Sequence, residues 1–416
     1  MKYAFKLLSF IGLLVTSVIF GIVFLGQKNI PDEIHLVDTD SLNVSSIFTV
    51  NVRDENLVFA ETAFSPVEAQ TDTGLSYTLN FSLFQTIPIK SSSVTVSRRQ
   101  YVVAGGEAFG IKLYTDGVII VGMDDISCGG TSQNPAKLAG LQTGDVIKAV
   151  DGKPVTKVSE VTGYFQNAQK SIIRLSVSRD GKPFETDINL IRSETDGSYK
   201  AGLWIRDSTA GVGTVTYYDR TNGLFAGLGH AVCDVDTGIA MPMLYGEAVD
   251  AVINGCYRGS PSVPGELCGA FTTRNLGKLY LNSENGIYGS LTKAVEGTEI
   301  PVATRQEVVT GDAEIIATVD NEGPKRYSVR ILKLSSSDNK ADKNMIIEVT
   351  DPELIEKTGG IVQGMSGSPI IQNGMLVGAV THVFVNNSTQ GFAILAENML
   401  ETSQALKKET ATDKAS

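Results

Sequence analysis

The sequence GGIVQGMSGSPII, residues Gly359–Ile371, is followed by Asn373-Gly374 and the apolar run Met375–Val377. Asn-Gly between two apolar runs is the strongest short-range signal for a two-residue hairpin, so we expect the runs on either side to pair as antiparallel strands. The glycines ahead of the hairpin allow backbone conformations that other residues reach only with strain. The pattern predicts that Ser366 lies on a tight turn at the start of a buried strand.

The core of this stretch, GMSGSP at residues 364–369, resembles the nucleophile turn of chymotrypsin-like serine peptidases, G-x-S-G-[GS]-P. Gly364 lets the backbone turn so that its N–H and that of Ser366 converge on a developing oxyanion, and Gly367 leaves room for an acyl group. Met365 stands where an aspartate usually precedes the serine. We expect Ser366 to be a nucleophile with the backbone N–H groups of Gly364 and Ser366 as its oxyanion hole. A glycine-rich β turn without chemistry is the alternative.

A nucleophilic serine needs a base, and the chain has three histidines. His35 lies close to the N-terminal apolar run. His382 lies in the strand-like segment Val380–Val385, where we expect it in the wall of a pocket. His230 ends the glycine-rich sequence GLGH and is the predicted base.

The residue that orients the base is less well determined by spacing. Asp351 precedes the serine, while Asp234 and Asp236 follow the histidine closely. Asp351-Pro352-Glu353 is also typical of a helix N-cap with proline in the first turn. A zinc site at His230 and Cys233 lacks a second pair of ligands, so we expect no metal and no cofactor.

Residues 101–191 contain NPAKLAGLQTGDVI (134–147) and the Asp151-Gly152 turn, and they resemble a PDZ domain. The sequence GGEAFGI ahead of them occupies the place of the PDZ carboxylate-binding loop. We expect Gly105, Gly106, Gly110 and Ile111 to bind a peptide end and to pair with the peptide as a strand. A strand-turn-helix unit that binds nothing is the alternative.

The N-terminus carries Lys2 and Lys6 followed by an apolar run from Leu7 to Gly26, which is long enough to span a bilayer. The run lacks the small-residue exit of a cleaved signal peptide, so we expect an uncleaved anchor. The positive residues before the run and Asp32-Glu33 after it place the rest of the chain outside the cytoplasm.

The composition of the chain limits its partners and its fold class. The chain has 416 residues, 42% of them hydrophobic and 19% charged, with a net charge of −11 that opposes nucleic acid as a partner. Its 42 glycines indicate many turns between short strands and a mainly β protein. We expect an anchor at 1–30, a small β-rich stalk at 31–100, the PDZ domain at 101–191, a double β-barrel peptidase at 200–405 and a disordered tail at 406–416.

The segments GLGHAVCDVDTG (227–238), VPGEL (263–267) and 359–369, with a PDZ domain ahead of them, resemble the SpoIVB-type serine peptidases of endospore-forming bacteria. The resemblance implies that Ser366, His230 and Asp351 form the triad. It also implies a signalling protease in the space between forespore and mother-cell membranes, which cleaves itself and a protein partner that restrains pro-sigma-K processing. The alternatives are an HtrA-like envelope quality-control protease, in which the peptidase would precede the PDZ domain, and a PDZ adaptor with an inactive peptidase fold.

Overall fold

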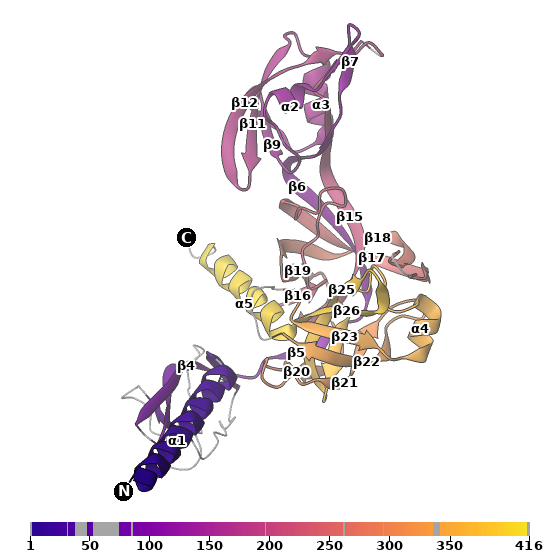
Figure 1. The fold of residues 1–416 in the computed structure, drawn as a ribbon. Helices are drawn as coiled ribbons and strands as arrows, with labels where there is room; N and C mark the ends of the chain where they lie inside the picture. Colours follow the sequence, from indigo (N-terminus) through magenta and orange to yellow (C-terminus); the bar gives the residue numbers. More distant parts are fainter. Residues whose placement is uncertain are drawn as a thin grey trace. The chain divides into compact units, whose positions relative to one another are not determined.

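The computed structural model describes residues 2–30, 32–37, 48–52, 75–84, 86–195, 197–260, 263–293, 295–335 and 342–413. The chain is mostly β and divides into two compact units, each described by itself (Figure 1). The first is Met1–Gln100 with Ala303–Val308, and the second is Tyr101–Val302 with Val309–Ser416. All candidate site residues lie in the second unit.

The first unit holds an apolar helix and a four-stranded sheet. Helix α1 (Lys2–Asn29) includes Ser9–Asn29, a stretch with mean hydropathy 2.4 that is long enough to cross a membrane. A secretory signal sequence would meet the same criterion, so the choice between anchor and signal stays a prediction. The strand order is β1-β4-β3-β2, with β1 parallel to β4. The strands are β1 (Glu33–Val37), β2 (Phe48–Val52), β3 (Leu75–Leu83) and β4 (Ile87–Ser97).

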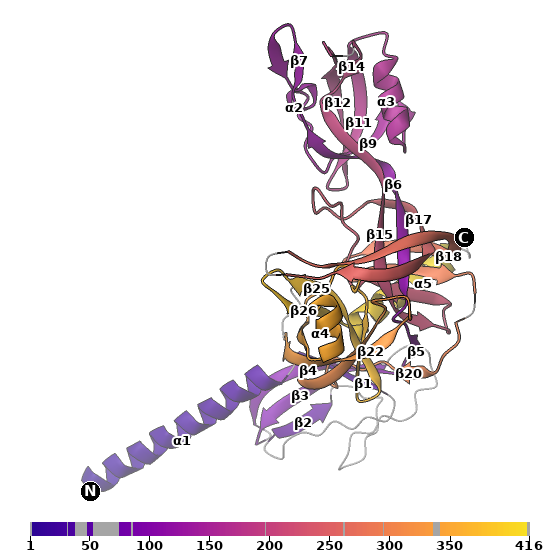
Figure 2. The ribbon, with the colours of Figure 1, turned by 90° about the vertical axis from the view of Figure 1, so that its right-hand side faces the viewer.

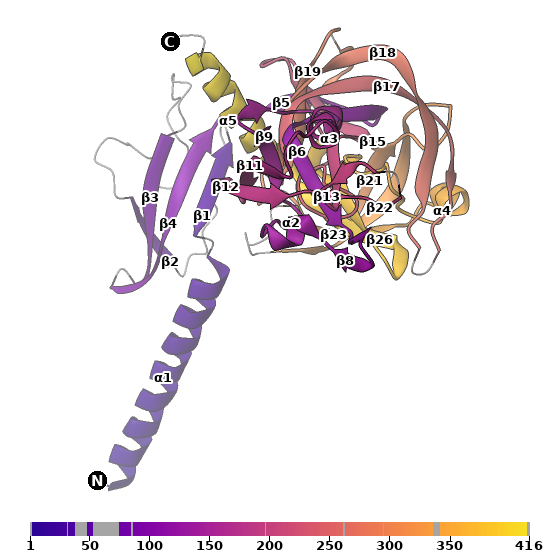
Figure 3. The ribbon, with the colours of Figure 1, turned by 90° about the horizontal axis from the view of Figure 1, so that it is seen from above.

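The second unit is built on a 12-stranded sheet of order β12-β11-β9-β6-β17-β18-β19-β16-β15-β5-β20, with β10 paired to β9. Strands β17 and β18 lie side by side along their length (Figure 3). The strands are β5 (Tyr101–Ala104), β6 (Ala108–Met123), β9 (Val146–Val150), β10 (Lys153–Pro154), β11 (Ile172–Arg179), β12 (Lys182–Asn189), β15 (Leu203–Asp219), β16 (Leu224–Gly227), β17 (Met243–Tyr257), β18 (Glu266–Ser283), β19 (Gly286–Leu291) and β20 (Glu299–Pro301). Two small hairpins join β7 (Ile126–Cys128) to β8 (Thr131–Gln133) and β13 (Ile191–Arg192) to β14 (Tyr199–Lys200).

Strands β6 and β15 form an antiparallel ribbon that passes through two hydrophobic cores (Figure 2). Near one end, residues 119–123 of β6 pair with 203–206 of β15. At the other end, residues 108–114 pair with 208–214 and border the core that contains Phe109, Leu113 and Phe225. Gly117, with φ of +102°, and a shift of register after Arg206 mark the junction.

The segment between the two ribbon strands folds as a separate core, which we call the inserted domain (residues 117–206). It contains helices α2 (Pro135–Leu138) and α3 (Val158–Gln166), and its buried residues run from Val118 to Ala201. The Asp151-Gly152 turn, with φ of +47° and +76°, connects β9 to β10 as the sequence predicted. The expected boundary near residue 100 coincides with the division between the two units after Gln100. Residues 101–114, which were expected to open the PDZ domain, instead belong to the sheet that continues after residue 207.

The glycines expected to form the PDZ carboxylate-binding loop lie outside the inserted domain. The N–H groups of Gly105 and Gly106 donate to carbonyls of β15 at 2.9 and 2.8 Å. Gly110 and Ile111 lie within β6, with β15 paired to one edge and β17 to the other. Because these N–H groups and both strand edges are already used, a peptide cannot join there, and the prediction is wrong for these four residues.

The second half of the peptidase region is a closed six-stranded barrel of order β21-β22-β23-β26-β25-β24. Its strands are β21 (Gly311–Ala317), β22 (Lys325–Leu334), β23 (Met345–Val349), β24 (Pro369–Gln372), β25 (Met375–Phe384) and β26 (Asn387–Leu395), and helix α4 (Pro352–Thr358) follows β23. Helix α5 (Ala396–Asp413) occupies most of the tail that was expected to be disordered. Met399 and Leu400 ahead of the tail and Leu406 within it are buried, and this apolar face anchors the helix that continues into the tail. Residues 414–416 of the expected tail lie outside the described residues.

Candidate active site

Ser366 lies on a turn whose shape depends on two glycines. Gly364 and Gly367 have φ of +97° and +95°, a region that favours glycine. A Cβ at position 367 would lie 2.0 Å from the carbonyl oxygen of Thr214, so only glycine fits there without movement of the backbone. Strand β24 follows at once, and Asn373-Gly374 turns the chain into β25 as the sequence predicted.

Thr214 of β15 holds the carbonyls of this turn. Its N–H donates to the Ser366 oxygen and its hydroxyl donates to the Gly364 oxygen, both at 2.9 Å. In the described part of the chain, no residue accepts a hydrogen bond from the N–H of Gly364 or of Ser366. Two backbone donors beside the serine hydroxyl are therefore available to an oxyanion, as the oxyanion-hole prediction requires.

His230 follows β16 through two residues in left-handed conformation, Leu228 and Gly229, with φ of +66° and +69°. Leu228 donates its N–H to the Thr214 carbonyl at 3.3 Å, the same threonine that holds the serine turn. A Cβ on Gly229 would lie 3.0 Å from a methyl of Thr381. The Ser366 hydroxyl donates to the Thr381 carbonyl at 2.7 Å. The serine turn and the turn before His230 thus share the same two threonine neighbours.

The imidazole of His230 is oriented by its own chain. Nδ1 lies 2.8 Å from the Ala231 carbonyl oxygen, and only an N–H at Nδ1 can donate to that acceptor. This tautomer leaves the lone pair on Nε2, as a general base requires. Burial lowers the pKa of His230, and the Ala231 carbonyl and the Asp342 charge partly oppose that shift.

His382 lies directly against His230. The two ring centroids are 4.6 Å apart with an interplanar angle of 38°. Nδ1 of His382 lies 3.4 Å from a carboxylate oxygen of Asp342, which the sequence interpretation did not single out. Burial, followed by the charge of His230, lowers the pKa of His382 to about 4. Asp342 lies three residues ahead of β23, and no local motif marks it.

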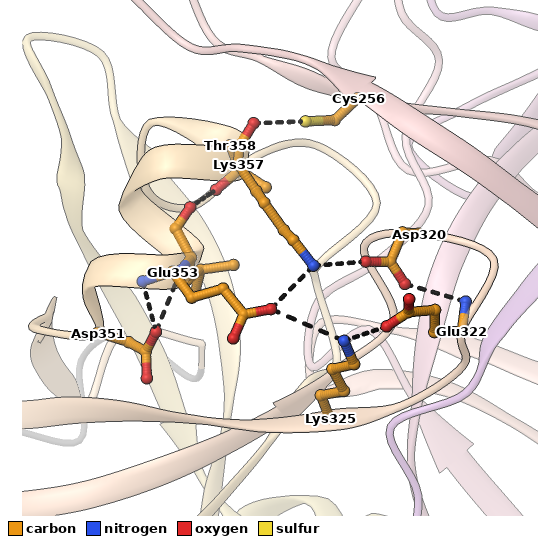
Figure 4. Close-up of polar contacts among 9 residues, drawn as sticks. Cys256, Asp320, Glu322, Lys325, Asp351, Glu353, Lys357 and Thr358 are labelled. Atoms are coloured by element: carbon orange, nitrogen blue, oxygen red, sulfur yellow. Dashed lines mark hydrogen bonds and ion pairs between the residues drawn. The ribbon is translucent and has the colours of Figure 1, made fainter.

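Asp351 is the N-cap of α4, the other role that its sequence context allowed. Its Oδ1 accepts hydrogen bonds from the N–H groups of Glu353 and Leu354 at 3.0 and 3.1 Å, and its Oδ2 accepts from Ser328 at 3.2 Å. Figure 4 shows the capped helix, with Glu353 turned towards Lys357 and away from Asp351. Among the described contacts, none joins Asp351 to His230.

Helix α4 is fixed by a network of charges as well as by its cap. Lys357 binds Asp320 at 2.7 Å and Glu353 at 2.8 Å, and Lys325 binds Glu322 (Figure 4). Hydrogen bonds to both carboxylates raise the pKa of Lys357, and that of Asp320 is lowered chiefly by its hydrogen bond to Lys357. These contacts fix the helix whose first turn Asp351 caps.

The other two candidate carboxylates bind an arginine of β15. Arg206 forms an ion pair with Asp234, whose side chain is fully buried, and a second with Asp236 at 2.7 Å. Oδ1 of Asp234 also accepts the N–H groups of Asp236 and Thr237. This cluster fixes the loop that follows His230.

Comparisons with known proteins assign two regions of the chain. A model of the SpoIVB peptidase S55 family matches residues 197–400, and a PDZ-domain model matches residues 130–179, which lie within the inserted domain. No curated protein matches the chain.

Similar solved structures include a PDZ domain and a protease. The PDZ domain of the SdrC-like protein (Lmo2051) from Listeria monocytogenes is 22% identical over 22% of this chain and 87% of its own, with a TM-score of 0.18. The Rv3671c protease from M. tuberculosis in its active form is 13% identical over 46% of this chain and 72% of its own, with a TM-score of 0.28.

The expected fold class is confirmed, with a mostly β chain, a PDZ domain and a protease-like β-barrel. Residues 197–400 include the predicted serine, histidine and aspartate, and the PDZ match lies ahead of them. Residues 197–400 are therefore a peptidase domain of the SpoIVB S55 family, and the chain is a serine peptidase that also carries a PDZ domain.

Proposed function

We propose that this chain is a membrane-tethered endopeptidase in which Ser366 is the nucleophile and His230 its base. The observation that carries this proposal is the pair of N–H groups at Gly364 and Ser366, which have no acceptor among the described residues, on a turn that shares Thr214 and Thr381 with the turn before His230. The assignment of the third triad member to Asp351 stays a prediction that rests on the family resemblance.

The chemistry requires one rotation of the serine side chain. The Ser366 hydroxyl leaves the Thr381 carbonyl and turns to Nε2 of His230, which takes the proton as Oγ bonds to the scissile carbonyl carbon. The carbonyl electron pair moves to its oxygen, which the N–H groups of Gly364 and Ser366 stabilise. His230 then gives the proton to the leaving amine, and water hydrolyses the acyl-enzyme by the same steps.

The PDZ domain offers a different peptide site from the one predicted. Residues 203–206 of β15 pair with β6 along one edge, and in the described part of the chain no strand pairs with their other edge. Helix α3 contacts β15, and Trp204 is 60% exposed. We propose that an extended peptide joins this edge beside α3, because PDZ domains bind peptides by adding a strand to a sheet edge.

We further propose that the substrates are the chain itself and a protein partner in the space between forespore and mother cell, and that cleavage signals for pro-sigma-K activation. The family match and the N-terminal apolar helix support this proposal. The positive residues ahead of the helix support an extracytoplasmic location for the rest of the chain.

The test is labelling of the full-length chain, in detergent, with a fluorophosphonate probe. Ser366→Ala and His230→Ala should each abolish labelling and self-cleavage, because the nucleophile and its base act as a unit and the loss of either one removes the activity of both. Ser368→Ala is the matched control, since this neighbouring hydroxyl is buried without a hydrogen-bond partner among the described residues and its loss should leave labelling intact. Labelling that persists in folded Ser366→Ala protein would overturn the assignment.

A further inference from the structure

A second histidine and a carboxylate lie against the proposed base, and the mechanism above does not use them. The ring of His382 is 4.6 Å from the ring of His230, and the Asp342 carboxylate lies on its Nδ1 side at 3.4 Å. The Nδ1 atom of His382 is buried and has no hydrogen bond with any described residue, although 40% of the side chain is exposed. A small movement of Asp342 would complete that hydrogen bond.

The base itself has a neutral partner. Its Nδ1 contacts the Ala231 carbonyl, which fixes the tautomer but carries no formal charge. A serine peptidase also needs negative charge close to its histidine, because the imidazole becomes an imidazolium when it takes the serine proton. Asp351, which the family resemblance assigns to this role, has both oxygens engaged with backbone N–H groups around α4.

One dipeptide of β25 connects all the groups concerned. The Thr381 carbonyl accepts the hydrogen bond of Ser366, and the Thr381 hydroxyl donates to the backbone carbonyl of Asp342 at 2.9 Å. The next residue, His382, packs against His230 with its ring tilted by 38°. The position of Asp342 is thereby tied to the strand that contacts both the nucleophile and the base.

We propose, on the basis of the function proposed above, that His382 and Asp342 are positioning residues that hold His230 and supply the negative charge its imidazolium requires. The imidazole of His382 packs against the ring of His230, and its Nδ1–H directs the Asp342 carboxylate towards the pair. The carboxylate then acts on the base across the second ring instead of through a direct hydrogen bond.

Charged groups of both signs surround the two imidazole rings. Burial and the charge of His230 lower the pKa of His382 to about 4, so it is neutral near pH 7 and does not repel the imidazolium. Asp342 acts to raise the pKa of both histidines and Lys343 acts to lower it. Lys343 lies over the ring of Phe392 at 5.4 Å. Burial raises the pKa of the nearby Cys233 thiol, which therefore stays neutral as well.

The test is the pH profile of fluorophosphonate labelling of the full-length chain. The labelling rate should rise with pH as His230 loses its proton and then reach a plateau. Asp342→Asn should lower the plateau rate about tenfold. It should also move the rising part of the profile, the acid limb, to lower pH by roughly one unit, since an opposite charge at this range shifts the pKa of the histidine by about that much. Lys343→Gln should move the acid limb in the opposite direction. His382→Phe keeps a ring against His230 but cannot donate to Asp342, so its loss and that of Asp342→Asn should not add in the double variant.

Two controls separate positioning from simple structural damage. Asp312→Asn removes the same charge from an exposed site on β21 and should leave the profile unchanged. Asp342→Glu restores the charge and should return the acid limb to its wild-type position, whatever its effect on the thermal melt. An unchanged profile in folded Asp342→Asn, or strictly additive losses in the double variant, would overturn the proposal. Absence of labelling in the wild-type chain would instead overturn the proposed function.

Discussion

Replacing Arg206 by alanine should loosen the loop that begins at His230, the proposed base. Arg206 is 29% exposed and forms ion pairs with the fully buried Asp234 and with Asp236, which is 54% exposed. Removing one partner of a buried pair leaves an uncompensated charge, at a cost of about 3–5 kcal/mol when both partners are fully buried. Water can reach the space that Arg206 vacates, and Asp234 keeps two backbone donors. We therefore expect Arg206→Ala to lower the opening free energy of the loop by about 2–3 kcal/mol.

The matched control is Asp236→Ala, which removes only the exposed pair and should cost at most about 1 kcal/mol. A chain of several domains does not unfold in a single two-state step, so a global melt would blur the difference. Amide hydrogen exchange of residues 231–241 measures the opening free energy of the loop itself. The same samples should show slower labelling of Ser366 in Arg206→Ala, because His230 lies at the start of this loop. Equal protection of residues 231–241 in Arg206→Ala and Asp236→Ala would show that the pair of Arg206 with buried Asp234 does not stabilise the loop.

Three further predictions concern the site and its surroundings. Gly367→Ala should abolish probe labelling and lower the melting temperature, because its Cβ would meet the Thr214 carbonyl at 2.0 Å. Gly374→Ala has open space around it, so it should lower the stability of the fold by only about 1 kcal/mol. The free energy of opening of β25 should fall as the pH drops from about 6.5 towards 4, because the opened segment protonates His382 while the folded chain keeps it neutral. Amide hydrogen exchange of β25 should show a weaker pH dependence of this free energy in His382→Gln. Asp351→Asn should lower the stability of the fold by about 1 kcal/mol, because an amide nitrogen would replace the oxygen that accepts the Ser328 N–H. If Asp351 is only a helix cap, the labelling rate of this variant should equal that of the wild type. A fall in the rate of about 10⁴ would establish Asp351 as the triad member.

The features that could be predicted from the sequence are those set by local backbone chemistry. Asn373-Gly374 and Asp151-Gly152 form the hairpin turns that these dipeptides favour, with positive φ at both residues. Gly364 and Gly367 adopt the positive φ that a tight turn around Ser366 requires. The proline and the glutamate that follow Asp351 also predict correctly that it caps a helix.

The features that could not be predicted depend on which strands pair across long stretches of sequence. Gly105, Gly106 and Gly110 have the spacing of a peptide-binding loop, and only the pairing of β6 with β15 and β17 shows that they belong to the peptidase sheet. Asp342 has no local motif. It becomes a candidate only because closure of the barrel brings its carboxylate beside Nδ1 of His382. Such contacts depend on register between distant strands, which a single sequence does not reveal.

The ribbon of β6 and β15 sets the order in which this peptidase can fold as it leaves the ribosome. Strand β6 emerges first but its long partner emerges only after the whole PDZ domain, so the PDZ domain serves as the connection that returns the chain to β6. Contacts between distant residues form slowly because the intervening loop must first be closed. The serine turn emerges later still, and β25 and β26 close its barrel last. A nascent or truncated chain therefore has no assembled active site, which delays proteolysis until synthesis is nearly complete.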